Sequence, residues 1–247
     1  MMDAKYTNKA KYYSKYRPTY PNECVEYILS ESKLKENSCV ADIGAGTGIF
    51  TKKIMDKDFT TYAIESNKDM FNELNKLKND NLITIHTKAE KTKLSNNSID
   101  LITVAQAFHW FDKYEFKQEC NRILKENCNI ALIWNEVDYN TNTGKHIMNL
   151  IEKYTNGNKL YKIDLSNNDS LVEGFFSSSY KKKIFSNNME LTKEQFVGDY
   201  LSKSYTPTEN SKEYKEYLED LNLLYDICSK DGLVNIEQNT YVYLGKI

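Results

Sequence analysis

Three glycines at alternate positions, Gly44, Gly46 and Gly48, follow a short apolar run at positions 39–43. The apolar run predicts a buried strand, and the helical spacing of the residues at 49–55 predicts a helix directly after the turn. Glycines suit such a turn because it adopts backbone angles that other residues avoid and lets a ligand approach bare main chain. A strand, a glycine turn and a helix in this order open the nucleotide-binding sheets of α/β proteins.

Two acidic residues near this turn indicate what kind of nucleotide it would bind. The spacing is G-x-G-x-G instead of the dinucleotide fingerprint G-x-G-x-x-G, and Asp42 stands two positions before the first glycine. A carboxylate there repels a pyrophosphate and attracts an ammonium or a sulfonium. Glu65 ends the next strand-like run, at 60–64, where an acidic side chain can accept hydrogen bonds from both ribose hydroxyls. The pattern describes a ligand with a ribose, a positive centre and no phosphate.

The order of these motifs along the chain resembles that of the class I S-adenosylmethionine-dependent methyltransferases. The resemblance runs from about position 12 to position 137, and it is strongest to the small-molecule branch that includes the trans-aconitate and quinone-biosynthesis (methyltransferase type 11) enzymes. It implies a Rossmann-like α/β fold: a mostly parallel seven-stranded sheet with an antiparallel last strand, helices on both faces and a small cap. It also implies S-adenosyl-L-methionine as the cofactor. The residues that carry it are Asp42-x-Gly44-x-Gly46-x-Gly48, Glu65-Ser66-x-x-x-Met70, Ala89-Glu90, the run from Asn97 to Ile102 and the run from Ala105 to Phe111.

The same resemblance assigns roles in cofactor binding. The turn at Ala89 and Glu90 is expected to wrap the adenine, with a main-chain amide on a ring nitrogen and the Glu90 carboxylate near the exocyclic amine. Residues after the strand predicted at 99–104 should line the reaction pocket, because ligands bind at the carboxyl edge of an open parallel sheet. The cofactor-binding residues expected on these grounds are Tyr16, Asp42, Gly44, Gly46, Gly48, Glu65, Ser66, Met70, Ala89, Glu90, Ala105 and Gln106.

A tyrosine-rich N-terminal segment that ends in Tyr16, Arg17 and Pro18 resembles the lid over the pocket in this family. Arg17 can pair in bidentate fashion with a carboxylate, either of the cofactor's methionine part or of the substrate. The alternative is an arm that merely packs on the sheet.

Methyl transfer from a sulfonium is an in-line displacement, so the protein contributes chiefly by aligning the reacting atoms and excluding water. A general base is needed only where the acceptor is an alcohol or a phenol. His109 is the candidate base in the predicted pocket, and its alternative role is structural, holding Trp110 and the loop after the strand. His86 lies within a predicted strand and His146 on a peripheral helix, so neither is a candidate. Aromatic walls suit a sulfonium, and the candidates are Phe108, Trp110, Phe111 and Tyr16.

Two other functions remain open. A nicotinamide-dependent oxidoreductase is disfavoured by the glycine spacing and by Asp42, Glu65 and Glu90 around the supposed phosphate position. A protein that binds S-adenosylmethionine as a sensor or partner subunit, without catalysis, stays possible because class I enzymes share no universal catalytic residue. The sequence does not set the acceptor class, the use of a base or the oligomeric state.

Length and composition limit the kinds of partner that this protein is expected to bind. The chain of 247 residues suits one α/β domain with an elaboration, and its net charge of −2 argues against nucleic acid, because a surface that tracks phosphates needs excess base. The five cysteines are scattered without metal-ligand spacing, so we expect reduced thiols, no metal and a cytoplasmic location. We see no secretory leader and no transmembrane stretch, so no membrane partner is expected. The expected partner is a small-molecule methyl acceptor.

The elements that must position these residues form a single methyltransferase domain over 1–247. Its expected parts are an N-terminal lid at 1–20, a cofactor-binding core at 21–137, a substrate cap at 138–210 and a closing helix and strand at 211–247. Further strands are predicted at 81–86, 99–104, 129–134, 180–185 and 240–244. Further helices are predicted at 22–30, 145–154, 192–204 and 214–228.

Overall fold

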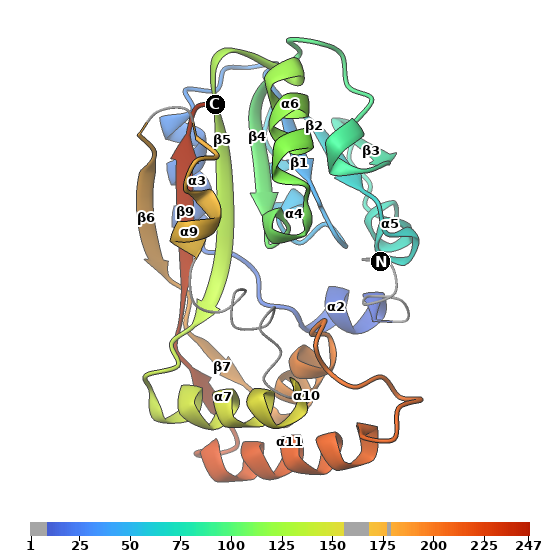
Figure 1. Ribbon diagram of the computed structural model, residues 1–247, viewed down its shortest axis with the longest axis vertical. Helices are drawn as coiled ribbons and strands as arrows, with labels where there is room; N and C mark the ends of the chain where they lie inside the picture. The colour runs from blue at the N-terminus through green and yellow to red at the C-terminus, as the bar shows by residue number, and fades with distance from the viewer. Residues whose placement is uncertain (1–8, 156–167, 177–178) are drawn as a thin grey trace.

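The computed structural model describes residues 9–155, 168–176 and 179–247 (Figure 1). The first eight residues of the expected lid, and the parts of the expected cap at 156–167 and 177–178, lie outside this description. The strands are β1 (Cys39–Ile43), β2 (Thr60–Glu65), β3 (Leu82–His86), β4 (Ile99–Ala105), β5 (Leu124–Val137), β6 (Lys181–Ser186), β7 (Met189–Leu191), β8 (Val234–Ile236) and β9 (Gln238–Gly245). The helices are α2 (Ala10–Tyr16), α3 (Asn22–Glu31), α4 (Thr51–Ile54), α5 (Lys68–Leu74), η1 (Ala89–Lys91), η2 (Phe108–Trp110), α6 (Lys113–Ile123), α7 (Asn142–Thr155), α9 (Asn168–Val172), α10 (Lys193–Leu201) and α11 (Tyr214–Cys228).

Seven strands form one sheet in the order β3-β2-β1-β4-β5-β9-β6. The pairs from β3 across to β5 are parallel, whereas β9 runs antiparallel to both of its neighbours, β5 and β6. This confirms the predicted Rossmann-like sheet with an antiparallel last strand. The parallel strands direct their carboxyl ends to one edge, which is the lower edge in Figure 1.

The central strands are buried on both faces, as expected where helices cover a parallel sheet on each side. On one face, Ile43 of β1 and Ile102 of β4 belong to a core cluster with Phe116 of α6. On the other face, Val40 and Leu101 of the same two strands belong to a cluster with residues of α3 and α4. Alternate residues of one strand therefore serve opposite helical layers, which confirms the expectation of helices on both faces.

A second group of elements lies beyond the carboxyl edge of the sheet. Figure 1 shows α7, α10 and α11 below this edge, with α2 between α10 and the sheet. These elements have their own core cluster, in which Ile147 of α7, Phe196 of α10 and Leu221 of α11 pack with β7 and β8. Gly198 of α10 lets α2 approach closely, because a Cβ there would lie 2.3 Å from the Tyr16 ring. The site therefore lies between the sheet edge and this helical layer.

Two differences from the predicted elements bear on the site. The strand predicted at 129–134 spans Leu124–Val137 in the structure. Because Ala105 of β4 is opposite Ile133, the last residues of β5 project beyond the end of β4. The β7–β8 pair was not predicted, since strands of three residues are too short to show a period. Within the described ranges, no helix has the length and apolar character needed to cross a membrane.

Candidate functional site

A cavity opens at the carboxyl ends of β1, β2 and β4, where the parallel-sheet rule places a ligand. Most of the predicted cofactor residues meet there. Those that line the cavity are Gly44, Gly46, Glu65, Ser66, Met70, Ala89, Ala105 and Gln106. The predicted aromatic residues Trp110 and Phe111 line it too, whereas Phe108 is fully buried in the core.

Glu65 is fixed at the end of β2 by two backbone donors. The Gly46 N–H donates to its Oε2 at 2.8 Å, and the Asn67 N–H donates to its Oε1 at 2.6 Å. A carboxylate offers about four acceptor positions, more than these two backbone donors use. Asn67 in turn caps α5 by accepting from the Asp69 and Met70 amides, which sets the helix that presents Met70.

Asp42 lies in the strand beneath the glycine turn and is completely buried. Thr51 donates to its Oδ2 at 2.6 Å and Thr103 donates to its Oδ1 at 3.0 Å. Burial raises the pKa of Asp42 to about 6, although the two threonine hydrogen bonds oppose the shift. Asp42 borders a smaller cavity that shares Tyr13, Gly44 and Gln106 with the first, so its field reaches a ligand from below the turn.

Gly44 and Gly48 of the turn are required for different reasons. Gly44 has φ +73°, and a Cβ there would lie 2.5 Å from the Ala107 Cβ, so only glycine fits between the turn and the chain after β4. Gly48 also has a positive φ, but a Cβ there would meet Leu77 at 2.5 Å. Gly48 is not among the cavity-lining residues, and its smallness serves packing against the segment after α5.

Of the two residues predicted to hold the adenine, Ala89 and Glu90, only Ala89 lines the cavity. The Glu90 Oε1 accepts from the Asp112 N–H at 3.0 Å, at the start of α6. Glu90 thus stabilises the approach to α6 in this structure, because the amide at a helix N-terminus attracts a carboxylate.

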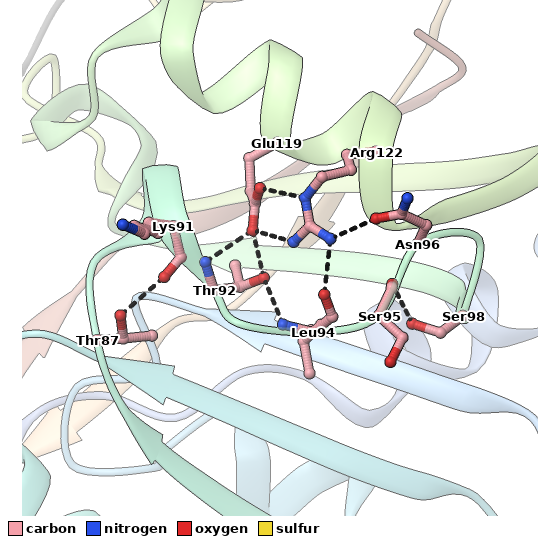
Figure 2. Close-up of polar contacts among 9 residues, drawn as sticks. All are labelled: Thr87, Lys91, Thr92, Leu94, Ser95, Asn96, Ser98, Glu119 and Arg122. Carbon is pink, nitrogen blue, oxygen red and sulfur yellow. Dashed lines mark hydrogen bonds and ion pairs between the residues drawn. The ribbon is translucent and has the colours of Figure 1, made fainter.

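An ion-pair network holds the segment after η1 against α6 (Figure 2). Arg122 binds both oxygens of Glu119 at 2.8 Å, and Glu119 accepts from the Thr92 N–H at 2.7 Å and its hydroxyl at 2.5 Å. Arg122 also donates to the Leu94 carbonyl and the Asn96 side chain, each at 2.7 Å. Burial opposes ionisation of Glu119, yet the hydrogen bonds from Arg122 and Thr92 hold its pKa below the ordinary value. The network fixes the chain that carries Ala89.

The N-terminal helix α2 contributes a residue that the sequence did not single out. Tyr13 lines the cofactor cavity, and the Arg17 guanidinium lies 4.7 Å from the centre of its ring. Tyr16, predicted to bind the cofactor, is directed away: its hydroxyl donates to Glu194 at 2.7 Å and its ring covers Gly198. Helical spacing places Tyr13 and Arg17, four positions apart, on one face, and this was the signal available in the sequence.

Beyond Gln106 the site continues into a third cavity, of about 130 Å³, between the sheet edge and the turn after α10. His109 borders it, and the Trp134 Nε1–H donates to the His109 Nδ1 at 3.5 Å. Sequence reasoning missed most of the polar wall, since its members come from distant segments without a shared motif. The polar residues of this cavity are Arg17, Gln106, His109, Asn135, Glu136, Lys203, Ser204 and Gln238, with Tyr13, Tyr139 and Tyr205.

Sequence comparison identifies the central segment. A model of the Methyltransf_11 family, described as a methyltransferase domain, matches residues 41–132. An uncharacterized methyltransferase of Schizosaccharomyces pombe is 32% identical over 146 residues, which are 59% of this chain and 58% of the relative. An uncharacterized methyltransferase of Mycobacterium tuberculosis is 31% identical over 126 residues, 51% of this chain and 50% of the relative. The chain thus matches little more than half the length of these curated relatives.

Solved structures share the whole fold. A protein of Anaeromyxobacter dehalogenans, given as a candidate type II methyltransferase, superimposes with a TM-score of 0.68 over 93% of this chain and 97% of its own, at 16% identity. Phosphoethanolamine N-methyltransferase 2 of Haemonchus contortus, solved with S-adenosylmethionine, gives a TM-score of 0.52 over 99% of this chain and 57% of its own, at 14% identity. The fold is therefore that of the class I methyltransferases, a class whose methyl donor is S-adenosylmethionine. Within this fold, residues 41–132 are the segment that matches the Methyltransf_11 family model.

Proposed function

We propose that this chain transfers the methyl group of S-adenosylmethionine to a small-molecule acceptor. The observation that carries the proposal is that the cofactor cavity adjoins the third cavity, since Tyr13 and Gln106 border both. A methyl group that points from the first cavity toward Gln106 meets an acceptor in the other. The acceptor lone pair forms the new bond to the methyl carbon while the carbon–sulfur bond breaks and its electron pair stays on sulfur.

The cofactor has a complementary environment along the first two cavities. Glu65 faces the ribose hydroxyls, Met70 and Ala89 flank the adenine, and Asp42 lies below the sulfonium and ammonium end. Gln106 is held in a left-handed conformation, φ 56°, while its Nε2 donates to the Asn135 carbonyl at 2.8 Å. Such strain persists only where surrounding structure holds it and often accompanies function, which supports a role for Gln106 at the point of transfer.

His109 has a positioning role in this proposal. Because Trp134 donates to Nδ1, the neutral ring carries its own proton on Nε2. Nε2 then already carries a proton and the Nδ1 lone pair faces the Trp134 indole, an arrangement poorly suited to taking a proton from the acceptor. This favours the structural alternative for His109 over its use as a general base.

Calorimetric titration with S-adenosylmethionine, S-adenosylhomocysteine and NADH tests the proposal. We expect the adenosyl ligands alone to bind, and Glu65→Gln to weaken them about 10- to 100-fold, since hydrogen bonds to a charged group contribute roughly 1.5–3 kcal/mol each. Glu26→Gln, an exposed position on α3, is the matched control and should leave both affinities unchanged.

The alternatives predict other results. Binding of NADH in place of the adenosyl ligands would support the oxidoreductase and overturn the proposal. Tight adenosyl binding without transfer of a labelled methyl group to any acceptor in a broad panel would support the sensor or partner subunit.

A further inference from the structure

The third cavity is bordered by an excess of positive charge. Lys203 lies 3.0 Å from one oxygen of Asp199, and the Arg17 Nε lies 3.9 Å from the other. Asp199 itself is 1% exposed and stands behind the cavity wall. Lys9 adds a third cation, because its ammonium donates to the Lys203 carbonyl at 2.7 Å and to the Thr206 hydroxyl at 2.7 Å. Two cations therefore share one buried carboxylate, and a third is bound to the backbone of the same turn.

The pKa values of Lys9 and Lys203 are lowered to about 8 by their burial and by the nearby positive charge of Arg17. On the other side of the cavity, burial raises the pKa of Glu136 to about 7, so this acid supplies only part of a negative charge at neutral pH. An additional anion placed in the cavity would relieve the repulsion among the cations.

A buried donor points to the same kind of ligand. Gln238, the first residue of β9, is 3% exposed and borders the cavity, and its side-chain Nε2 has no hydrogen-bond partner within the described chain. Buried amide donors in native structures almost always have partners, so an orphan donor beside a cavity calls for an acceptor that comes with the ligand.

The cofactor makes the balance more positive still. S-adenosylmethionine carries a sulfonium, an ammonium and one carboxylate, a net charge of +1. Even where Arg17 pairs with the cofactor carboxylate, Lys203 remains in the cavity wall, with Lys9 buried behind it. The loaded site therefore favours a negatively charged second substrate.

We propose that the acceptor is a small organic acid, and that its carboxylate is bound in the third cavity by Lys203 and Gln238 with Arg17 at the cofactor side. This inference rests on the proposed function and names the substrate class for the same site. It concerns recognition: the anion anchors the acceptor while its nucleophilic atom is directed toward Gln106.

The test uses four probes: benzoate, succinate and their uncharged counterparts benzamide and succinamide. Each is titrated calorimetrically into the protein alone and into the protein saturated with S-adenosylhomocysteine. We expect the acids to bind at least tenfold more tightly than the amides. Amides that bind as tightly as the acids would overturn the inference while leaving cofactor binding, and hence the proposed function, intact.

Two variants locate the anion. Lys203→Gln and Gln238→Leu should each weaken acid binding at least fivefold, Lys203→Arg should restore most of the loss, and the exposed control Lys212→Gln should change nothing. Thermal unfolding and S-adenosylhomocysteine affinity report whether each variant is folded. Should Lys203→Gln unfold, Lys203→Arg and Gln238→Leu still decide the matter, because only an anion site predicts retention in the first and loss in the second.

A further arm separates the acceptor's carboxylate from the cofactor's. Methylthioadenosine lacks the amino-acid part of S-adenosylhomocysteine. We expect Lys203→Gln to leave the affinities for both nucleosides unchanged. If it weakens S-adenosylhomocysteine but not methylthioadenosine, the cations serve the cofactor, and the inference is wrong. If neither nucleoside binds the wild-type protein although benzoate does, the proposed function fails and the acid site stands.

Discussion

The two ends of the site satisfy their buried polar groups in different ways. At the cofactor end, Asp42 accepts from two threonine hydroxyls and Glu65 accepts from the Gly46 and Asn67 amides. At the acceptor end, Lys203 and Arg17 approach one Asp199, and the Gln238 amide lacks a partner in the described chain. The cofactor end is thus organised before its ligand arrives, whereas the acceptor end depends on its ligand to complete it. Preorganisation favours affinity, and incomplete satisfaction favours selectivity for the one ligand that completes the site.

The largest effect on stability should follow from adding a Cβ to the glycine turn at the cofactor end. Gly44→Ala combines a strained positive φ with a Cβ 2.5 Å from the Ala107 Cβ. We expect the free energy of unfolding to fall by about 3 kcal/mol, from strain and overpacking together, and cofactor affinity to fall with it. Gly232→Ala is the control, since its φ is +79° with nothing near its Cβ. Urea denaturation should show a loss of about 1 kcal/mol there; equal losses would refute the crowding argument.

The next effect concerns the buried carboxylate beneath the turn. Because the folded-state pKa of Asp42 is raised to about 6, the folded protein holds the proton that the unfolded chain releases near pH 4. Its contribution to stability is therefore full below pH 4 and is lost as the pH rises through 6. Asp42→Asn should remove this loss, so the variant gains about 2–3 kcal/mol relative to wild type between pH 4 and pH 7. Chemical denaturation at intervals of pH measures it; parallel curves would contradict the assignment.

A third substitution weakens the support of the cofactor end at a residue that does not line its cavity. Glu119→Gln breaks the ion-pair network of Figure 2, and we expect about 2 kcal/mol lower stability because hydrogen bonds to a charged group are lost. Cofactor affinity should fall only a few-fold, roughly 1 kcal/mol or less, since Ala89 is displaced indirectly. Glu126→Gln, exposed near the start of β5, is the control. A cofactor loss as large as that of Glu65→Gln would place Glu119 in the binding machinery.

The smallest effect sharpens the acceptor end. As the pH rises through 7, Glu136 ionises and adds negative charge to the cavity, so benzoate affinity should fall roughly two- to fivefold between pH 6 and 8. Glu136→Gln should flatten this dependence, and the slope that remains would report the other titrating groups. A slope unchanged by the variant would exclude Glu136 as its source. The titratable and charged groups around Glu136 are Lys182, Asp169, Tyr241, His109, Arg17, Lys203 and Tyr139.

The same contrast explains what the sequence could predict. Most residues that line the cofactor cavity lie between Gly44 and Phe111, at or just after the ends of β1, β2 and β4, so motif spacing pointed to most of the cavity wall but not to Tyr13. The helix at Tyr214–Cys228 was predicted with the observed bounds because its apolar period is long and regular. The direction of a side chain was harder to predict. Tyr13 and Tyr16 lie in the same helix, and the contact of the Tyr16 ring with Gly198 leaves Tyr13 as the one that faces the cavity.

Most of the acceptor end was beyond prediction for a physical reason. Arg17 and His109 were candidates from the sequence, but Glu136, Lys203 and Gln238 come from three other segments, and each alone looks like an ordinary polar residue. Their roles arise from the projection of β5 past the sheet edge and from the packing of α10 beneath it. Neither feature leaves a period or a motif in the chain.

The insertion of β9 between β5 and β6 also has a consequence for the order of folding. Gln238 pairs with Val137, about a hundred positions earlier, so the wall of the acceptor cavity depends on one of the longest-range strand pairings in the sheet. Contacts between remote parts of a chain form late, because the loop between them must first be ordered. β1 to β4, by contrast, lie within the first 105 residues. On the ribosome, the nascent protein should therefore become able to hold its nucleoside well before it can hold a second substrate.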